Sequence, residues 1–187
     1  MTIRPLLLVA FLPLGLLAAP GPASPPRIAV LSIALNDVAN QPASPTLPAR
    51  MAELGTALRA RLATACGYAI VPIDSAVEAS ADVTAGYLYA HPDLAVALAG
   101  SARAEWLVVP RLNRASPWVT ELQAEVVRVR DTLVVSNRIV ELKGIELTPE
   151  LGAKLAERGA AWMADQVSQV IERTSGSSGP PPRRCPA

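Results

Sequence analysis

The chain has 187 residues, 51% of them hydrophobic, and its 17 basic residues nearly balance 16 acidic ones. A chain with so little net charge lacks the electrostatic footprint of a protein that binds nucleic acid or an anionic membrane surface. It contains one histidine and two cysteines, whereas a zinc site needs three or four ligands from Cys, His and carboxylates. We therefore expect no metal and no other cofactor.

The first 23 residues have the pattern of a secretory signal peptide. Arg4 is their only charged residue, an apolar stretch covers residues 6–17, and small residues and prolines follow it. This stretch is shorter than the roughly 20 residues that span a bilayer. We expect cleavage after Ala23 and export to the periplasm without a stable membrane anchor. The alternative is an N-terminal anchor that is never cut.

Residues 24–173 have the length of one domain; a domain of this size buries about 70% of the surface of its extended chain. Residues 174–187 are rich in serine, glycine and proline and are expected to be disordered. The domain contains Cys66 and the tail contains Cys185. An oxidising compartment permits a disulfide between them, but the expected disorder of the tail favours a buried Cys66 and an exposed Cys185 as separate thiols.

Apolar runs and helical periodicities predict elements in the order β-α-β-α-α-β-β-β-α. The first strand is Arg27–Leu35, an almost wholly apolar run, and the first helix is Ala49–Cys66, which follows Pro48. The second strand, Tyr68–Ile73, contains Pro72 near its end. Because proline cannot donate to a ladder, we expect this strand at an edge of the sheet or ending there.

The middle of the chain predicts two helices before the next strand. Asp74 or Ser75 caps the first helix, and His91-Pro92-Asp93 opens the second. Trp106–Val109 is a short apolar run, typical of a buried strand. A closing helix from Thr148 to Arg173 is expected to bury one stripe of side chains: Leu151, Leu155, Trp162, Gln166, Val167 and Val170.

The two longest alternating runs, Trp118–Arg130 and Leu133–Lys143, are joined at Asp131-Thr132 and predict a β-hairpin. In both arms the apolar positions change face, at Val126-Val127 and at Ile139-Val140. Either both arms carry a bulge there, or the outer face of the sheet is covered over part of its length. The buried strand and the hairpin then form the middle of a mixed sheet with helices packed on it, an α/β (α+β) fold.

Five features of this chain occur in an order that resembles a known family. They are the first strand ending in Asn36-Asp37, a Gly-Tyr strand after a helix, Gly86-Tyr87-Leu88 with His91-Pro92-Asp93, Ala104-Glu105-Trp106, and the hairpin. Over roughly residues 27–173 the chain resembles an uncharacterised bacterial periplasmic family known as a domain of unknown function. The pattern is also similar to the N-terminal domain of TolB and to the curli secretion protein CsgG.

The resemblance implies a TolB-like or CsgG-like fold. Relatives of this kind bind other envelope proteins or assemble into oligomers, and none is defined by a catalytic site. Some members of the family are encoded near periplasmic quinoprotein dehydrogenases, which suggests one partner system. Other members carry Cys-x-x-Cys in the middle of the chain; this sequence lacks it, so thiol chemistry there does not carry over.

His91 is the only histidine, so any zinc site or catalytic triad has to include it. Asp93 is the only other ligand type close by, and no Gly-x-Ser-x-Gly turn presents a nucleophile. The plainer interpretation is a residue at a helix start whose ring packs on Tyr87 or Tyr89. We therefore expect no catalytic residue and no enzyme.

Other polar and aromatic positions are candidates for binding. Asn36-Asp37 follows a central strand, where ligands bind in open α/β sheets, although an Asx turn that closes the strand is the simpler interpretation. Trp118 is a candidate exposed contact, with a core position as the alternative. Arginines 111, 114, 128 and 130 alternate with glutamates and predict a solvated face of mixed charge. The candidate binding residues are Asn36, Asp37, Tyr87, Tyr89, His91 and Trp118.

These observations favour a non-enzymatic periplasmic accessory protein that binds another envelope protein through the hairpin edge or the loops around His91. The alternative is a periplasmic small-ligand-binding protein with a pocket near Asn36, Asp37 and Tyr87. An enzyme centred on His91 and an oligomeric secretion pore are less favoured. The sequence leaves the identity of the partner and the oligomeric state open.

Overall fold

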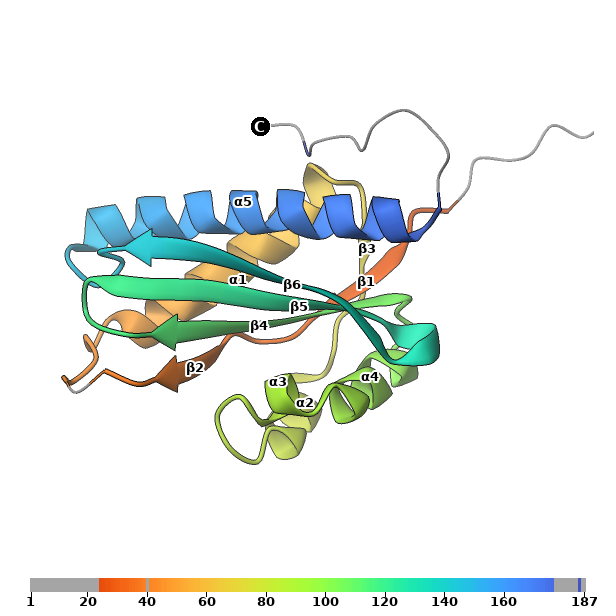
Figure 1. The fold of residues 1–187 in the computed structure, drawn as a ribbon, viewed down its shortest axis with the longest axis horizontal. Coiled ribbons are helices and arrows are strands. Elements are labelled where there is room, and N and C mark those ends of the chain that lie inside the picture. The colour runs from red at the N-terminus through yellow and green to blue at the C-terminus, as the bar shows by residue number, and fades with distance from the viewer. Residues whose placement is uncertain (1–23, 40, 177–184, 186–187) are drawn as a thin grey trace, which may run out of the picture.

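The computed structural model describes residues 24–39, 41–176 and 185. The predicted signal peptide and most of the predicted tail lie outside these residues. Figure 1 shows the elements of the described part in chain order: β1 (Arg27–Val30), β2 (Ala34–Asp37), α1 (Leu47–Thr64), β3 (Ala69–Ile70), α2 (Ser75–Ala81), α3 (Tyr87–Ala90), α4 (Pro92–Ser101), β4 (Trp106–Arg114), β5 (Val119–Arg128), η1 (Val129–Asp131), β6 (Leu133–Lys143) and α5 (Pro149–Thr174).

The strands form one mixed sheet in the order β3-β1-β4-β5-β6, and β2 also pairs with β4. β1 and β2 run parallel to β4, whereas β5 and β6 add to it as an antiparallel hairpin. β3 lies at an edge, as Pro72 predicted. The predicted fold class is therefore confirmed, and β4 is the strand that connects the parallel and antiparallel halves.

The first predicted strand, residues 27–35, is interrupted in the structure. β1 pairs with the start of β4 and β2 with its end, and Leu31–Ile33 stand opposite Val109 and Pro110. Pro110 has no N–H to donate to a neighbouring strand, so a regular ladder cannot continue past it. The break in one strand is thus caused by a residue about 80 positions away on its partner.

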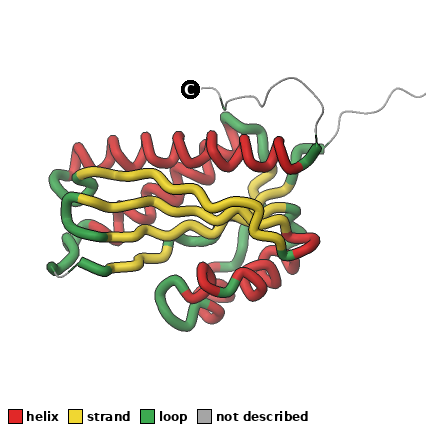
Figure 2. Tube along the Cα trace, in the orientation of Figure 1, coloured by secondary structure: helices red, strands yellow, loops and turns green. Residues whose placement is uncertain are grey.

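Helices cover the sheet on both faces, as Figure 2 shows. α1 and α5 pack on one face over a core that includes Leu54, Leu58, Val108 and Met163. α3 and α4 pack on the other face over a smaller core, which lies on β1, the first half of β4 and the end of β5. None of the helices in the described residues combines the length and apolarity needed to cross a membrane.

The hairpin forms where the sequence predicted it, with one irregularity in its ladder. Val126 pairs with Ser136 but Val127 pairs with Val134, so Val135 is an extra residue in β6. The extra residue turns the Val135 side chain to the face that α5 covers, where it packs against the larger core. The register shift falls at Val126-Val127, one of the two places where a bulge was predicted, but the extra residue lies in β6 and not in β5.

The second predicted bulge, at Ile139-Val140, is wrong. Ile139 and Val140 continue a regular ladder with β5, and Ile139 points to the open face with 52% of its surface exposed. The other explanation, a partly covered outer face, holds at the end of β5. Val127 is fully buried in the smaller core, and Val129 packs against that core.

The closing helix α5 forms as predicted, but its buried stripe is different. Thr148 caps it by accepting a hydrogen bond from the Leu151 N–H at 3.2 Å. Leu151 and Trp162, predicted to be buried, are 38% and 41% exposed, whereas Val167 and Val170 are buried as predicted. Small residues occupy much of the true stripe and let the helix approach the sheet closely: Gly152, Ala156, Gly159, Ala160 and Ala164.

Gly152→Ala is expected to lower the free energy of unfolding by about 1–3 kcal/mol, as overpacking of a tight contact does. A Cβ atom at this position would lie 2.6 Å from the Ile145 carbonyl oxygen and 2.9 Å from Arg50 Nε. Urea denaturation measures the loss. Gly100→Ala in α4 is the matched control, because its Cβ would meet nothing closer than 3.9 Å, and it should leave stability unchanged or raised. Equal behaviour of the two variants would contradict this account of the contact.

Cys66 and Cys185 form a disulfide, with 4.7 Å between their Cα atoms. The separate thiols favoured from the sequence are therefore wrong. The Cys185 N–H donates a hydrogen bond to Asp165 Oδ1 at 3.2 Å, which places Cys185 beside the middle of α5. The disulfide therefore joins the segment just after α1 to Cys185, which lies beside α5.

Candidate functional site

Arg114, the last residue of β4, is a completely buried arginine. Its Nε donates to Glu146 Oε1 at 2.5 Å, and its Nη1 donates to Asp37 Oδ1 at 3.0 Å. Its remaining N–H groups donate to the carbonyl oxygens of Gln41 and Pro42 at 2.8 and 3.0 Å. The planar guanidinium, with its fixed fork of donors, thus engages two carboxylates and two backbone carbonyls at once.

These contacts fasten three chain segments together at one end of the sheet: the end of β2, the loop before α1, and the loop between β6 and α5. Glu146 contributes twice, because its second oxygen accepts a hydrogen bond from the Ser44 N–H at 2.8 Å. The Glu146 side chain is only 4% exposed. A buried ion pair whose groups are all hydrogen-bonded holds its surroundings in one arrangement.

The charges of this cluster reinforce each other. The Arg114 guanidinium holds the pKa of Asp37 below its ordinary value of 3.8, mainly through their hydrogen bond. The hydrogen bonds that Arg114 donates to Glu146 and Asp37 in turn raise the pKa of Arg114. The Asp37 carboxylate also accepts the Ala39 N–H at 3.1 Å, so the Asx turn predicted as the simpler interpretation of Asn36-Asp37 is present.

Asp37 is expected to make the free energy of unfolding depend on pH in the acidic range. Because its pKa is lower in the folded state, its stabilisation is complete above its ordinary pKa of 3.8 and is lost as the pH falls through the lowered value. Asp37→Asn should therefore be less stable than the natural chain near neutral pH, and the difference should shrink below about pH 3. Urea midpoints measured across this range check the expectation. Asp93→Asn, at an exposed residue of α4 without an ion pair, is the control.

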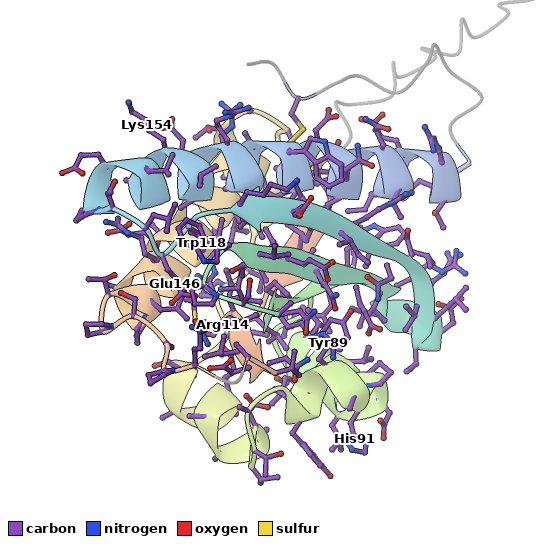
Figure 3. All side chains as sticks on the ribbon, turned by 60° about the vertical axis from the view of Figure 1, so that its left-hand side comes forward. Tyr89, His91, Arg114, Trp118, Glu146 and Lys154 are labelled. Carbon is purple, nitrogen blue, oxygen red and sulfur yellow. A yellow bond between two sulfur atoms is a disulfide. The ribbon has the colours of Figure 1, made fainter. Side chains whose placement is uncertain are left out.

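Exposed apolar side chains lie on the segments that adjoin the Arg114 cluster. Gly144 N–H donates to the Trp118 carbonyl at 2.9 Å, and Val38 N–H donates to the Arg114 carbonyl at 3.0 Å, so the adjoining loops are bonded to one another. We call the following residues the Trp118 patch, with their exposed fractions: Val38 (59%), Trp118 (63%), Leu147 (43%) and Leu151 (38%). Figure 3 shows Trp118 at the same end of the molecule as Arg114 and Glu146.

The predicted aromatic residues of α3 lie elsewhere. Tyr87 and His91 pack on each other with 4.1 Å between their ring centroids, which is the plain role expected for His91. Tyr89 is buried, and its hydroxyl accepts a hydrogen bond from Asn137 Nδ2 at 2.7 Å. The Arg111 guanidinium lies 3.9 Å from the centroid of the Tyr89 ring. Burial raises the pKa of Tyr89, so these contacts join α3 to the sheet through a neutral phenol.

The structure therefore places Asp37 and Trp118 at the same end of the sheet, at the end of β2 and in the loop between β4 and β5, whereas Tyr87 and His91 lie at the two ends of α3. Asn36 lies beside Asp37, but its side chain donates to Asn113 Oδ1 at 2.7 Å. The hollow between β2 and α3 is only about 10 Å³, too small for an organic ligand. The described residues also contain no group of three or more His, Cys, Asp or Glu placed to hold a metal ion.

Sequence reasoning missed Arg114 and Glu146 as central residues of this site. Arg114 was assigned to a solvated face of mixed charge, which is wrong for this arginine. A signal was present in the alternation of the strand, since Arg114 lies on the same face as Val108 and Leu112. Glu146 carries no such signal, because it lies in a loop.

Known structures share this fold at low sequence identity. A PelC dodecamer from Paraburkholderia phytofirmans is 15% identical with a TM-score of 0.50, over 80% of this chain and 90% of that one. The LpoB C-terminal domain from Salmonella enterica is 13% identical with a TM-score of 0.46, over 67% and 87%. TolB from Acinetobacter baumannii is 11% identical with a TM-score of 0.46, over 80% and 29%. At these identities the likeness concerns the fold alone.

No curated protein sequence matches the chain. The model of a family named DUF3280, which carries the description "Protein of unknown function (DUF2380)", matches residues 26–146, more than half of the chain. This agrees with the resemblance inferred from the sequence to a domain of unknown function. The chain belongs to that family, DUF3280.

Proposed function

We propose that this protein is a non-enzymatic accessory protein of the periplasm that binds another envelope protein through the Trp118 patch. The observation that carries the proposal is the patch itself, in which four large apolar side chains lie exposed on loops held by the buried Arg114 cluster. Contiguous exposed apolar surface with a polar rim is typical of protein-binding sites. Tryptophan is among the residues most enriched at binding hot spots.

Rigidity supports the same conclusion. A docking surface that is already ordered loses less conformational entropy on binding than a flexible one. The loops of the Trp118 patch are bonded to Arg114, Glu146 and each other, so little further ordering is needed.

The predicted signal peptide and the disulfide support the proposed cellular setting, since disulfides persist in oxidising compartments such as the periplasm. The candidate histidine is engaged in packing on Tyr87, which supports a binding role over a catalytic one. The resemblance suggests a quinoprotein dehydrogenase system as the first place to look for the partner.

Trp118→Ser is expected to weaken binding of the partner about 30-fold, which corresponds to about 2 kcal/mol for a hot-spot residue. The test is capture of periplasmic proteins on the tagged mature chain, with the stoichiometry of any partner measured. Leu94→Ser is the control, because Leu94 is 41% exposed on α4, outside the patch. Equal retention by both variants, or no stoichiometric partner with the natural chain, would contradict the proposal.

A further inference from the structure

β6 is the last strand of the sheet, and among the described residues only β5 pairs with it. One side of this 11-residue strand therefore presents unpaired backbone N–H and C=O groups. Exposed sheet edges are templates for the addition of another strand, and most proteins shorten or cover them. β6 is long and carries exposed apolar side chains instead: Leu133 (47%), Val134 (36%) and Ile139 (52%).

A groove of about 340 Å³ runs between this edge and α5. Val140 and Leu142 line it from the strand, and Leu155, Gly159 and Trp162 line it from the helix. Gly159 allows α5 and β6 to approach closely at the base of the groove, because a Cβ atom there would lie 2.8 Å from the Leu142 side chain. Trp162 is 41% exposed beside the groove. Figure 1 shows the arrowhead end of β6 beside α5, whereas the other end of the strand turns away from the helix.

An edge strand with a helix beside it is the arrangement that accepts an extended peptide. The backbone of the peptide pairs with the edge, and its alternate side chains enter the groove beside the helix. A strand added at the usual spacing of about 4.8 Å would lie next to β6 and bring every second side chain over Val140, Leu142 and Trp162. The apolar lining of the groove suits aliphatic side chains at those positions.

Three charged side chains line the groove: Glu141, Lys143 and Arg158. Lys143 is paired with Glu141 at 3.5 Å, but Arg158 and Arg138 form no ion pair with any described residue. Arg138 lies on the same face of β6 as Val140 and Leu142, and its Nε is buried without a hydrogen-bond partner.

We propose that the groove between β6 and α5 binds an extended acidic segment of a partner protein, added to the sheet as a strand beside β6. Its carboxylates accept hydrogen bonds from Arg158, and its aliphatic side chains contact Trp162. A second copy of this chain fits less well, since two-fold pairing of β6 with itself opposes two grooves of the same charge. This recognition surface does not depend on the Trp118 patch, so each can fail without the other.

The test is a titration of the ¹⁵N-labelled mature chain, with its disulfide intact, followed by NMR. The probes are two synthetic decapeptides with threonine at every second position; the positions between, which share one face of a strand, carry valine alternating with glutamate in one peptide and valine alternating with lysine in the other. The glutamate peptide should shift the amide signals of Ser136–Lys143 and the indole N–H of Trp162, and it should bind at least tenfold more tightly than the lysine peptide.

Arg158→Glu should weaken binding of the glutamate peptide at least tenfold, whereas Arg173→Glu, at the exposed last turn of α5, should not change it. Absence of binding, equal binding of both peptides, or shifts that map to β2 instead of β6 would overturn the proposal. A doubled mass by light scattering, with β6 signals that depend on protein concentration without peptide, would overturn it in favour of a second copy.

Discussion

Arg114→Leu is expected to lower the free energy of unfolding by about 3–5 kcal/mol, the usual cost of removing one partner of a buried ion pair. The variant leaves the Glu146 carboxylate buried, with its side chain 4% exposed, and without its guanidinium partner. It also leaves the carbonyls of Gln41 and Pro42 without their donor. Urea denaturation of the disulfide-intact chain measures the loss, with the slope of the transition as a check on two-state behaviour.

Two further variants isolate the cause. Arg128→Leu removes the ion pair between Arg128 and Asp131, whose side chains are 18% and 41% exposed; it should cost less than about 1 kcal/mol, as exposed pairs do. The double variant Arg114→Leu with Glu146→Leu removes both charges and should recover part of the stability, because apolar replacements of buried pairs are often neutral. A cost of Arg114→Leu no larger than that of Arg128→Leu would refute the role given to the cluster.

Loss of the disulfide is the second large effect. Replacing Cys66 and Cys185 together by alanine is expected to cost about 3–5 kcal/mol, because a long loop then becomes free in the unfolded chain. The two cysteines are 119 positions apart in the sequence, and the entropic contribution of a cross-link grows with this distance. Urea denaturation of the natural chain, with and without reductant, should show the same difference as the double alanine variant.

A shortened chain distinguishes the stabilisation due to the disulfide from any other stabilisation by the tail. Removal of residues 177–187 together with Cys66→Ala should match the double alanine variant if the tail stabilises the protein through the disulfide alone. The expectation fails if reductant leaves the urea midpoint of the natural chain unchanged. In that case the bond would form without constraining the unfolded state.

Local patterns predicted much of this fold. The alternating runs predicted the hairpin, Pro48 lies in the first turn of α1, which begins at Leu47, and the face change at Val126-Val127 marks the point where both faces of β5 are covered. These features depend on residues that are neighbours in the sequence, so their cause is visible there. The interruption between β1 and β2 is different, because its cause is Pro110 on another strand and appears only once the pairing is known.

The predictions that were wrong concern contacts between segments that are distant in the sequence. In α5 the apolar period suggested Leu151 and Trp162, but close packing on the sheet selected glycine and alanine instead. The disulfide required the chain beyond α5 to return beside Asp165, which composition alone did not indicate. The candidate site was found in part: Asp37 and Trp118 were named, but the arginine that organises them was assigned to a solvated surface.

The extra residue Val135 in β6 has a consequence for solubility. Fibrils grow when flat edges of many copies stack in register, which requires a straight, uninterrupted strand. A bulge bends its strand and increases the local twist, so the edge of β6 is divided near Val135 and cannot match a flat copy of itself over its whole length. A short, flexible segment can still follow the remaining edge from Ser136 to Lys143. One inserted residue thus protects an apolar edge from aggregation without closing it.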